Sequence, residues 1–172
     1  MVIYLIGFMG SGKTFWAEKL SARLNVPWFD LDLLIEEQEG EAVKDIFSSK
    51  GEDHFRQQEH DLLKGFSMSF PDPGGVQAIL SCGGGTPCFH DNMDLMNASG
   101  TTLWLNPPVH ILAARLARDA GQRPLLAGKS GEELENFISL KLEERRSWYE
   151  QAAVIINEPV PSLQGIINAL AT

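Results

Sequence analysis

The sequence has 172 residues, of which 44% are hydrophobic, and this combination fits one domain with a substantial core and excludes a disordered chain. The net charge of -9 argues against a nucleic-acid partner, because phosphate backbones require a basic binding surface. No apolar run approaches the ~20 residues of a membrane helix, and the N-terminus lacks the basic region of a signal peptide. We therefore expect one soluble cytoplasmic domain over residues 1–172, with no membrane partner and with reduced thiols at Cys82 and Cys88.

Five short apolar runs separated by helical patterns predict an α/β fold with a mostly parallel sheet. The expected strands are residues 2–6, 28–30, 78–82, 101–105 and 154–156. Apolar residues at helical spacing predict helices over residues 15–24, 109–116, 132–153 and 163–170. Two of these helices have typical start signals before them, at Pro107-Pro108 and at Pro161-Ser162.

Two segments are longer than a simple alternation of strands and helices requires. Residues 31–66 have a helical pattern between the second and third strands, and we interpret them as a substrate-binding insertion. Residues 119–131 are polar and rich in glycine, and we interpret them as a mobile lid. Ligands of α/β sheets bind beyond the carboxyl ends of the strands, which is where both segments are expected to lie.

Residues 7–14 spell the phosphate-binding P-loop motif G-x-x-x-x-G-K-[ST] between a buried strand and a helix. Its glycines let the backbone wrap around a phosphate, and amides at the helix N-terminus offer partial positive charge. Lys13 is expected to reach the β- and γ-phosphates, and the hydroxyl of Thr14 is expected to bind Mg²⁺. The motif and its context predict binding of a nucleoside triphosphate.

Two carboxylates, Asp30 and Asp32, close the second strand beside the P-loop. One can serve a metal ion and the other the hydroxyl group of an acceptor. An alternative is that Asp32 caps the helix that follows, and the sequence alone leaves this alternative open. Three consecutive glycines, Gly83, Gly84 and Gly85, follow the third strand and would let a ligand approach the backbone closely.

Arginines provide the positive charge that such a site needs. Arg56 follows Phe55 and precedes Glu59 by three residues, so it can clamp a carboxylate, although an ordinary surface ion pair is the alternative. Arg118 is placed to stack on a base, and Arg123 in the lid can reach the transferred phosphoryl group. A second carboxylate clamp is expected at Arg145 or Arg146; for each arginine the alternative is a solvated surface residue.

The four histidines lack the spacing of a metal site, and the four tryptophans are expected to pack in the core or between helices.

Taken in order, these motifs resemble shikimate kinase over essentially the whole chain. The resemblance includes residues 6–14, 29–32, 45–47, 51–52, 55–56, 59, 81, 83–85, 123–126, 144–145 and 149. It implies the fold of a P-loop kinase similar to the nucleoside monophosphate kinases, with a five-stranded parallel sheet of order 2-3-1-4-5 flanked by helices, and a lid. It also implies transfer of the γ-phosphoryl group of ATP to the 3-hydroxyl of shikimate by a Mg²⁺-dependent monomer, in the biosynthesis of chorismate and aromatic amino acids.

The resemblance further implies roles for individual residues. Lys13 and Arg123 would stabilise charge on the transferred group, and Asp32 would be the base. Thr14 and Asp30 would serve Mg²⁺, with Ser81 supporting its water shell. The nucleotide would contact Gly10, Ser11, Gly12, Lys13, Thr14, Phe15, Arg118, Arg123 and Pro159. Shikimate would contact Asp32, Phe47, Phe55, Arg56, Gly83, Gly84, Gly85 and Arg145.

The chain departs from the family pattern in two places. The family usually has two small hydroxyl residues, an aliphatic residue and glycine after the P-loop lysine, whereas here Thr14 is followed by Phe15, Trp16 and Ala17. The proline expected between Arg145 and Tyr149 is also absent. The rival hypotheses are another small-metabolite P-loop kinase, such as a gluconate kinase, and a nucleotide-binding protein that has lost catalysis. Two arginines directed at one ring-lined pocket favour a compact cyclic carboxylate over the first rival.

Overall fold

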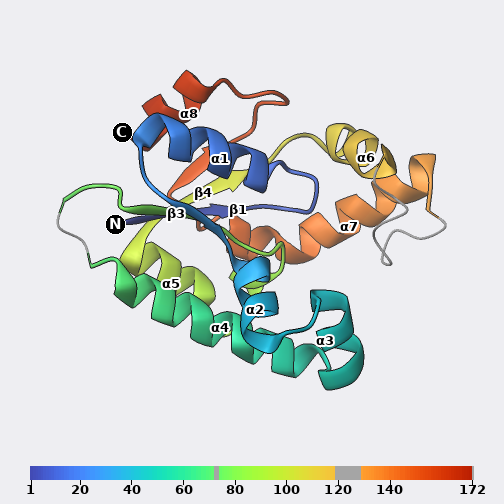
Figure 1. Ribbon diagram of the computed structural model, residues 1–172. Helices are drawn as coiled ribbons and strands as arrows, with labels where there is room; N and C mark the ends of the chain where they lie inside the picture. Colours follow the sequence, from blue (N-terminus) through green and yellow to red (C-terminus); the bar gives the residue numbers. More distant parts are fainter. Residues whose placement is uncertain (72–73, 119–128, 172) are drawn as a thin grey trace.

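The computed structural model describes residues 1–71, 74–118 and 129–171 (Figure 1). Its centre is a five-stranded sheet of order β2-β3-β1-β4-β5, in which every pair is parallel. The strands are β1 (Val2–Ile6), β2 (Trp28–Asp30), β3 (Ala78–Ser81), β4 (Gly100–Leu105) and β5 (Val154–Ile156). The predicted strand order is confirmed. The predicted bounds are correct for three strands, while β3 ends one residue earlier and β4 begins one residue earlier than expected.

Helices cover both faces of this sheet (Figure 1). They are α1 (Lys13–Leu24), α2 (Leu31–Glu39), α3 (Val43–Lys50), α4 (Glu52–Ser69), α5 (Asn92–Ser99), α6 (Val109–Arg118), α7 (Gly131–Tyr149) and α8 (Leu163–Leu170), with a short 3₁₀ helix η1 (Thr86–Cys88). The 31–66 excursion therefore consists of α2, α3 and most of α4. Neither η1 nor α5 was predicted, because residues 86–99 carry no regular apolar period.

Most of the core lies on the two faces of β1, whose five residues are all completely buried, and a smaller cluster joins Phe8 to α6 and α7. On one face, Ile3 and Leu5 pack with apolar residues of α1 and α8. On the other face, Tyr4 and Ile6 pack against a cluster that includes residues of α2 to α5 and Tyr149 of α7. A strand buried on both faces is uniformly apolar, which is why the run 2–6 shows no alternation.

The start of α2 decides an alternative that the sequence left open. The cap of this helix is Asp30, whose carboxylate accepts a hydrogen bond from the backbone N–H of Asp32 at 3.1 Å. Asp32 is therefore not the cap; it lies in the first turn of α2, where a negative charge interacts favourably with the helix dipole. Its carboxylate is thus left available for other contacts.

The end of α7 differs from the predicted bound. The helix stops at Tyr149, not at residue 153, because the chain turns there to enter β5, and the N–H of Ala153 donates to the hydroxyl of Thr102 at 2.8 Å. Of the two tryptophans Trp104 and Trp148, Trp104 is buried in the core and Trp148 is 38% exposed on α7. No helix in the described part of the chain is long and apolar enough to cross a membrane.

Candidate active site

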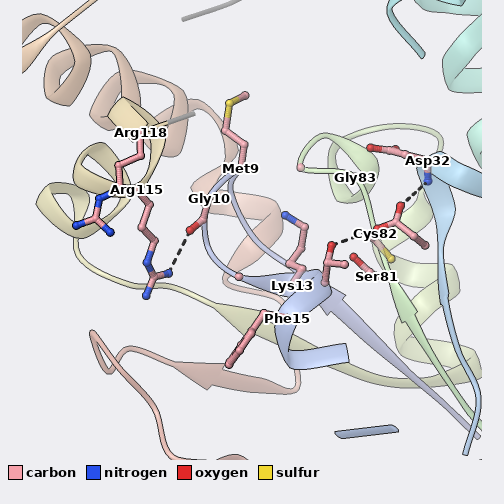
Figure 2. Close-up of a pocket in the computed structure, with 14 residues that line it drawn as sticks. Met9, Gly10, Lys13, Phe15, Asp32, Ser81, Cys82, Gly83, Arg115 and Arg118 are labelled. Carbon is pink, nitrogen blue, oxygen red and sulfur yellow. Dashed lines mark hydrogen bonds between the residues drawn. The ribbon is translucent and has the colours of Figure 1, made fainter. Parts of the chain in front are cut away.

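A cavity of about 470 Å³ opens where the carboxyl ends of β1, β2 and β3 meet (Figure 2). Parallel strands deliver the loops that follow them to one edge of the sheet, so residues distant in sequence meet there. Residues predicted for the site that line the cavity are Gly10, Gly12, Lys13, Thr14, Phe15, Asp30, Asp32, Ser81, Gly83, Gly84 and Arg118. The cavity therefore joins the P-loop, both carboxylates and part of the glycine triplet, the three consecutive glycines at positions 83–85.

The P-loop backbone has the shape that its glycines permit. Gly7 and Gly12 have φ angles of 141° and 97°, which residues with a side chain rarely adopt. A Cβ on Gly7 would lie 2.5 Å from the carbonyl oxygen of Leu105, so this position also needs glycine for space. The Nζ of Lys13 donates to the carbonyl oxygens of Gly7 and Phe8, at 2.9 and 3.1 Å. Lys13 thus bends back over the loop and holds its charge there.

Arg115 is a site residue that the sequence analysis missed. Its NH1 donates to the carbonyl oxygen of Gly10 at 3.1 Å (Figure 2) and to that of Ser11 at 3.2 Å. Its NH2 donates to the carbonyl oxygen of Pro159 at 3.3 Å. Arg115 thus ties α6 to the P-loop and to the segment after β5, and it lines the cavity together with Arg118. The only signal in the sequence is its position one helical turn before Arg118.

Asp32 lies on the opposite side of the cavity from Arg115 and Arg118 (Figure 2), and Asp30 also lines the cavity. The hydroxyl of Thr14 donates to Asp30 Oδ2 at 3.3 Å, and the register of β2 and β3 sets Ser81 beside Asp30. Burial, and then the negative charges of Asp30 and Glu59, raise the pKa of Asp32 to about 6. Lys13 and Arg56 act in the opposite direction but do not offset these causes.

Arg56 lies among aromatic rings at the end of the glycine triplet. Its guanidinium is 5.1 Å from the ring centroid of Phe55, 5.9 Å from that of Phe47 and 4.2 Å from that of Phe89. NH1 donates to Glu59 at 2.8 Å, and the side chain of Arg56 is only 11% exposed. Such burial excludes the ordinary surface ion pair that the sequence left open. Phe89 was missed, because nothing in its local sequence points to Arg56.

The glycine triplet is packed directly against the two arginines. A Cβ on Gly85 would lie 2.6 Å from NH2 of Arg56, and one on Gly84 would lie 3.3 Å from NH1 of Arg145. Arg145 NH1 also donates to the carbonyl oxygen of Gly84 at 3.0 Å, as does the hydroxyl of Tyr149 at 2.5 Å. Burial raises the pKa of Tyr149 to about 12, which keeps this hydroxyl protonated as a donor at neutral pH.

Arg145 and Arg146 point to different places. Arg145 reaches the glycine triplet and lies 5.5 Å from the ring centroid of Phe8 in the P-loop. Arg146 is 52% exposed, pairs with Glu143 and Glu150, and lines a separate cavity beside β4. Of the two candidates for a carboxylate clamp, only Arg145 therefore faces the candidate active site.

Comparison with known proteins identifies the family. The family model described as shikimate kinase matches residues 9–168. The chain belongs to the shikimate kinase family. A shikimate kinase of Parabacteroides distasonis is 42% identical over 152 residues, which cover 88% of this chain and 84% of the relative. Members of this family are ATP-dependent phosphotransferases.

Solved shikimate kinase structures have the same fold. The crystal structure of the shikimate kinase from Bacteroides thetaiotaomicron is 37% identical, with a TM-score of 0.85 over 99% of this chain and 94% of that one. The shikimate kinase from Acinetobacter baumannii in complex with shikimate is 28% identical, with a TM-score of 0.81 over 97% of this chain and 88% of that one. The family membership predicted from the sequence is confirmed.

Some residues assigned from the shikimate kinase resemblance lie at the margin of the cavity or outside the described residues. Phe15 is 53% exposed at the cavity edge, where its ring packs edge-on against Trp16. Ser11 is buried and lines a small neighbouring cavity with Arg115 and Pro159. Arg123 and residues 119–128 of the predicted lid lie outside the described part of the chain.

Proposed function

We propose that this member of the shikimate kinase family transfers the γ-phosphoryl group of ATP to the 3-hydroxyl of shikimate. The observation that carries the proposal is the arrangement of Asp32, Arg56 and Arg145 around the glycine triplet, directly beside a P-loop. Two guanidinium groups can hold the carboxylate of a small ring, while a carboxylate beside the P-loop can hold one of its hydroxyl groups. The shikimate complex of the Acinetobacter baumannii relative supports this choice of substrate.

The nucleotide half of the site is formed by the P-loop and α6. The amides of the loop, together with Lys13, would cradle the phosphates of ATP and stabilise the charge on the transferred group. Arg115 holds the loop carbonyls of Gly10 and Ser11 and would keep the cradle rigid. Arg118 would lie against the adenine base, with Pro159 nearby. Arg123, proposed from the sequence, would reach the transferred group from the lid.

The oxygen atoms beside the P-loop suit a magnesium ion. Thr14 and Asp30 already contact each other, and Ser81 lies next to Asp30 on the neighbouring strand. Among the described residues there is no group of three or more histidine, cysteine or acidic side chains that could hold a metal ion. This fits Mg²⁺, which binds one or two protein oxygens and otherwise water and phosphate. When bound, it would neutralise charge on the phosphates of ATP.

Asp32 is proposed as the base. As the acceptor oxygen forms its bond to phosphorus and the bond from phosphorus to ADP breaks, the hydroxyl proton would pass to the Asp32 carboxylate. Lys13 lies close enough to lower the pKa of Asp32, which places the base and the phosphate-binding cation in one electrostatic environment. Asp30, by contrast, is held by a hydrogen bond from the backbone of α2 and by one from the hydroxyl of Thr14.

This role predicts an acid limb in the pH profile. The pKa of Asp32 is raised to about 6, so the carboxyl group is protonated below that pH and cannot accept a proton. We expect kcat/KM for shikimate to fall as the pH decreases through about 6 and to level off above it. The residual activity of Asp32→Asn should lack this limb. A wild-type profile that stays flat through this range would contradict the assignment.

One experiment tests the function as a whole. ADP release should be measured with shikimate, quinate, gluconate and a nucleoside monophosphate as acceptors, at saturating ATP and Mg²⁺. We expect strong stimulation by shikimate, because the arginine pair and the aromatic lining fit a cyclic carboxylate. Stimulation by gluconate without any by shikimate would overturn the proposal. The monomeric state and the cytoplasmic location expected from the sequence belong to the proposal as well.

A further inference from the structure

A buried carboxylate supports Arg56 from behind. Glu59 is completely buried, and its Oε2 accepts a hydrogen bond from Arg56 NH1 at 2.8 Å. Its other oxygen, Oε1, accepts a short hydrogen bond from the hydroxyl of Thr86, which is also completely buried. Glu59 is therefore held from two sides, by the arginine that faces the substrate pocket and by a threonine that follows the glycine triplet.

The hydrogen bonds continue beyond Thr86. Asn92, completely buried, donates from Nδ2 to the backbone oxygen of Thr86 at 2.9 Å. A carbonyl oxygen can only accept, so Nδ2 must face Thr86 and Oδ1 must face His60, whose Nδ1 lies 2.7 Å away. His60 Nδ1 therefore carries the proton. The result is a directed chain from His60 through Asn92 and Thr86 to Glu59.

The backbone between Thr86 and Asn92 turns so that Asn92 reaches back to the carbonyl oxygen of Thr86, whose hydroxyl contacts Glu59. His90 and Asp91 have φ angles of 49° and 55°, in the left-handed region that costs free energy for residues other than glycine. Strained positions of this kind persist where the surrounding contacts determine them. The same turn sets the ring of Phe89 4.2 Å from the guanidinium of Arg56. Two contacts to the Arg56–Glu59 pair, from Thr86 and from Phe89, thus come from one short segment.

Arg56 has a competing partner on the solvent side. Its Nε and NH2 donate to Oε1 of Glu52, at 3.2 and 3.1 Å, and the side chain of Glu52 is 54% exposed. If Glu59 were free to turn, the exposed carboxylate of Glu52 would hold the guanidinium away from the pocket for part of the time. A fixed Glu59 keeps NH1 anchored and so limits this movement.

We infer that Thr86 and Asn92 are positioning residues for the substrate: they fix Glu59, which holds the guanidinium of Arg56 in the orientation that receives the substrate carboxylate. The inference rests on the proposed function, in which Arg56 binds that carboxylate. It predicts that the hydroxyl of Thr86 acts on shikimate binding without touching shikimate.

The test removes this hydroxyl while keeping the shape of the side chain. Thr86→Val should raise the KM for shikimate by roughly tenfold to a hundredfold, as expected for losing a hydrogen bond to a buried charged group, while the KM for ATP stays within about twofold. Thr86→Ser keeps the hydroxyl and should restore most of the affinity. If Thr86→Val does not fold, Thr86→Ala is measured instead with the same criteria.

Thr102→Val is the matched control. Thr102 is also completely buried and fully hydrogen-bonded, since its hydroxyl donates to Asn97 at 2.6 Å and accepts from the N–H of Ala153. It lies on β4 away from the cavity, so this variant should lose stability but keep its KM for shikimate. An equal rise in KM for both valine variants would mean that the effect is general loosening, and the inference would be wrong.

A double variant separates the inference from the proposed function. In an Arg56→Ala background, Thr86→Val should cause little further loss of shikimate affinity, because the residue it acts through is gone. If Arg56→Ala raises the KM but Thr86→Val alone does not, the inference fails and the function stands. If Arg56→Ala itself leaves the KM unchanged, the role of Arg56 in the proposed function fails, and the inference fails with it.

Discussion

Replacing Lys13 with alanine is expected to lower kcat by roughly a hundredfold to a thousandfold or more, while shikimate binding hardly changes. The charge of Lys13 is held over the P-loop by the carbonyl oxygens of Gly7 and Phe8. The negative charge of the transferred phosphoryl group lies next to this loop, where the ammonium group of Lys13 would contact it. The contribution therefore appears in the chemical step, and binding of the substrate carboxylate, which we propose at Arg56 and Arg145, does not depend on it.

The measurement is a pair of constants for each variant: kcat from ADP release, and the dissociation constant for shikimate from calorimetry. Lys64→Ala is a suitable control, because Lys64 is exposed on α4 and lies outside the cavity. It should match the wild type in both constants. Activity of Lys13→Ala that recovers at high shikimate concentration would contradict the expected role, since it would mean that Lys13 contributes to acceptor binding instead.

Replacing Arg56 with alanine is expected to weaken shikimate binding by about 2–5 kcal/mol and to leave ATP binding nearly unchanged. Two causes act together. The substrate carboxylate loses a guanidinium that is only 11% exposed and surrounded by aromatic rings, where water screens the interaction poorly. The completely buried carboxyl group of Glu59 loses its cationic partner, so no guanidinium stands between it and the incoming substrate carboxylate.

Calorimetric titrations with shikimate and with ATP give the two affinities directly. Arg146→Ala is the matched control: it removes an arginine from an exposed face of α7, next in sequence to Arg145 but directed away from the site. Its shikimate affinity should stay within about twofold of the wild type. Arg56→Lys should recover only part of the loss, because an ammonium group lacks the planar fork of guanidinium. Equal weakening of both ligands in Arg56→Ala would show that the residue is structural.

The sequence by itself was sufficient for the sheet, the P-loop and the family. The five strands could be predicted because each is a short and largely apolar run, so the signal lies within the strand itself; the central strand β1 is in addition completely buried. The P-loop could be predicted because its glycines and Lys13 act through backbone geometry over eight consecutive residues. The start of α8 is similarly local, since Ser162 accepts from the N–H of Gly165 at 3.0 Å, within one turn.

Only the tertiary structure decided which side chains meet at the site. Arg115 contacts P-loop residues that lie more than 100 positions earlier in the sequence. Thr86 contacts Glu59, and Phe89 contacts Arg56, across a sequence separation of about thirty residues. The choice between Arg145 and Arg146 depends on the rotation of α7 about its axis, which packing against the P-loop and the glycine triplet sets. Such contacts leave no periodic or local trace in the sequence, because they form only when parallel strands bring separate loops to one edge of the sheet.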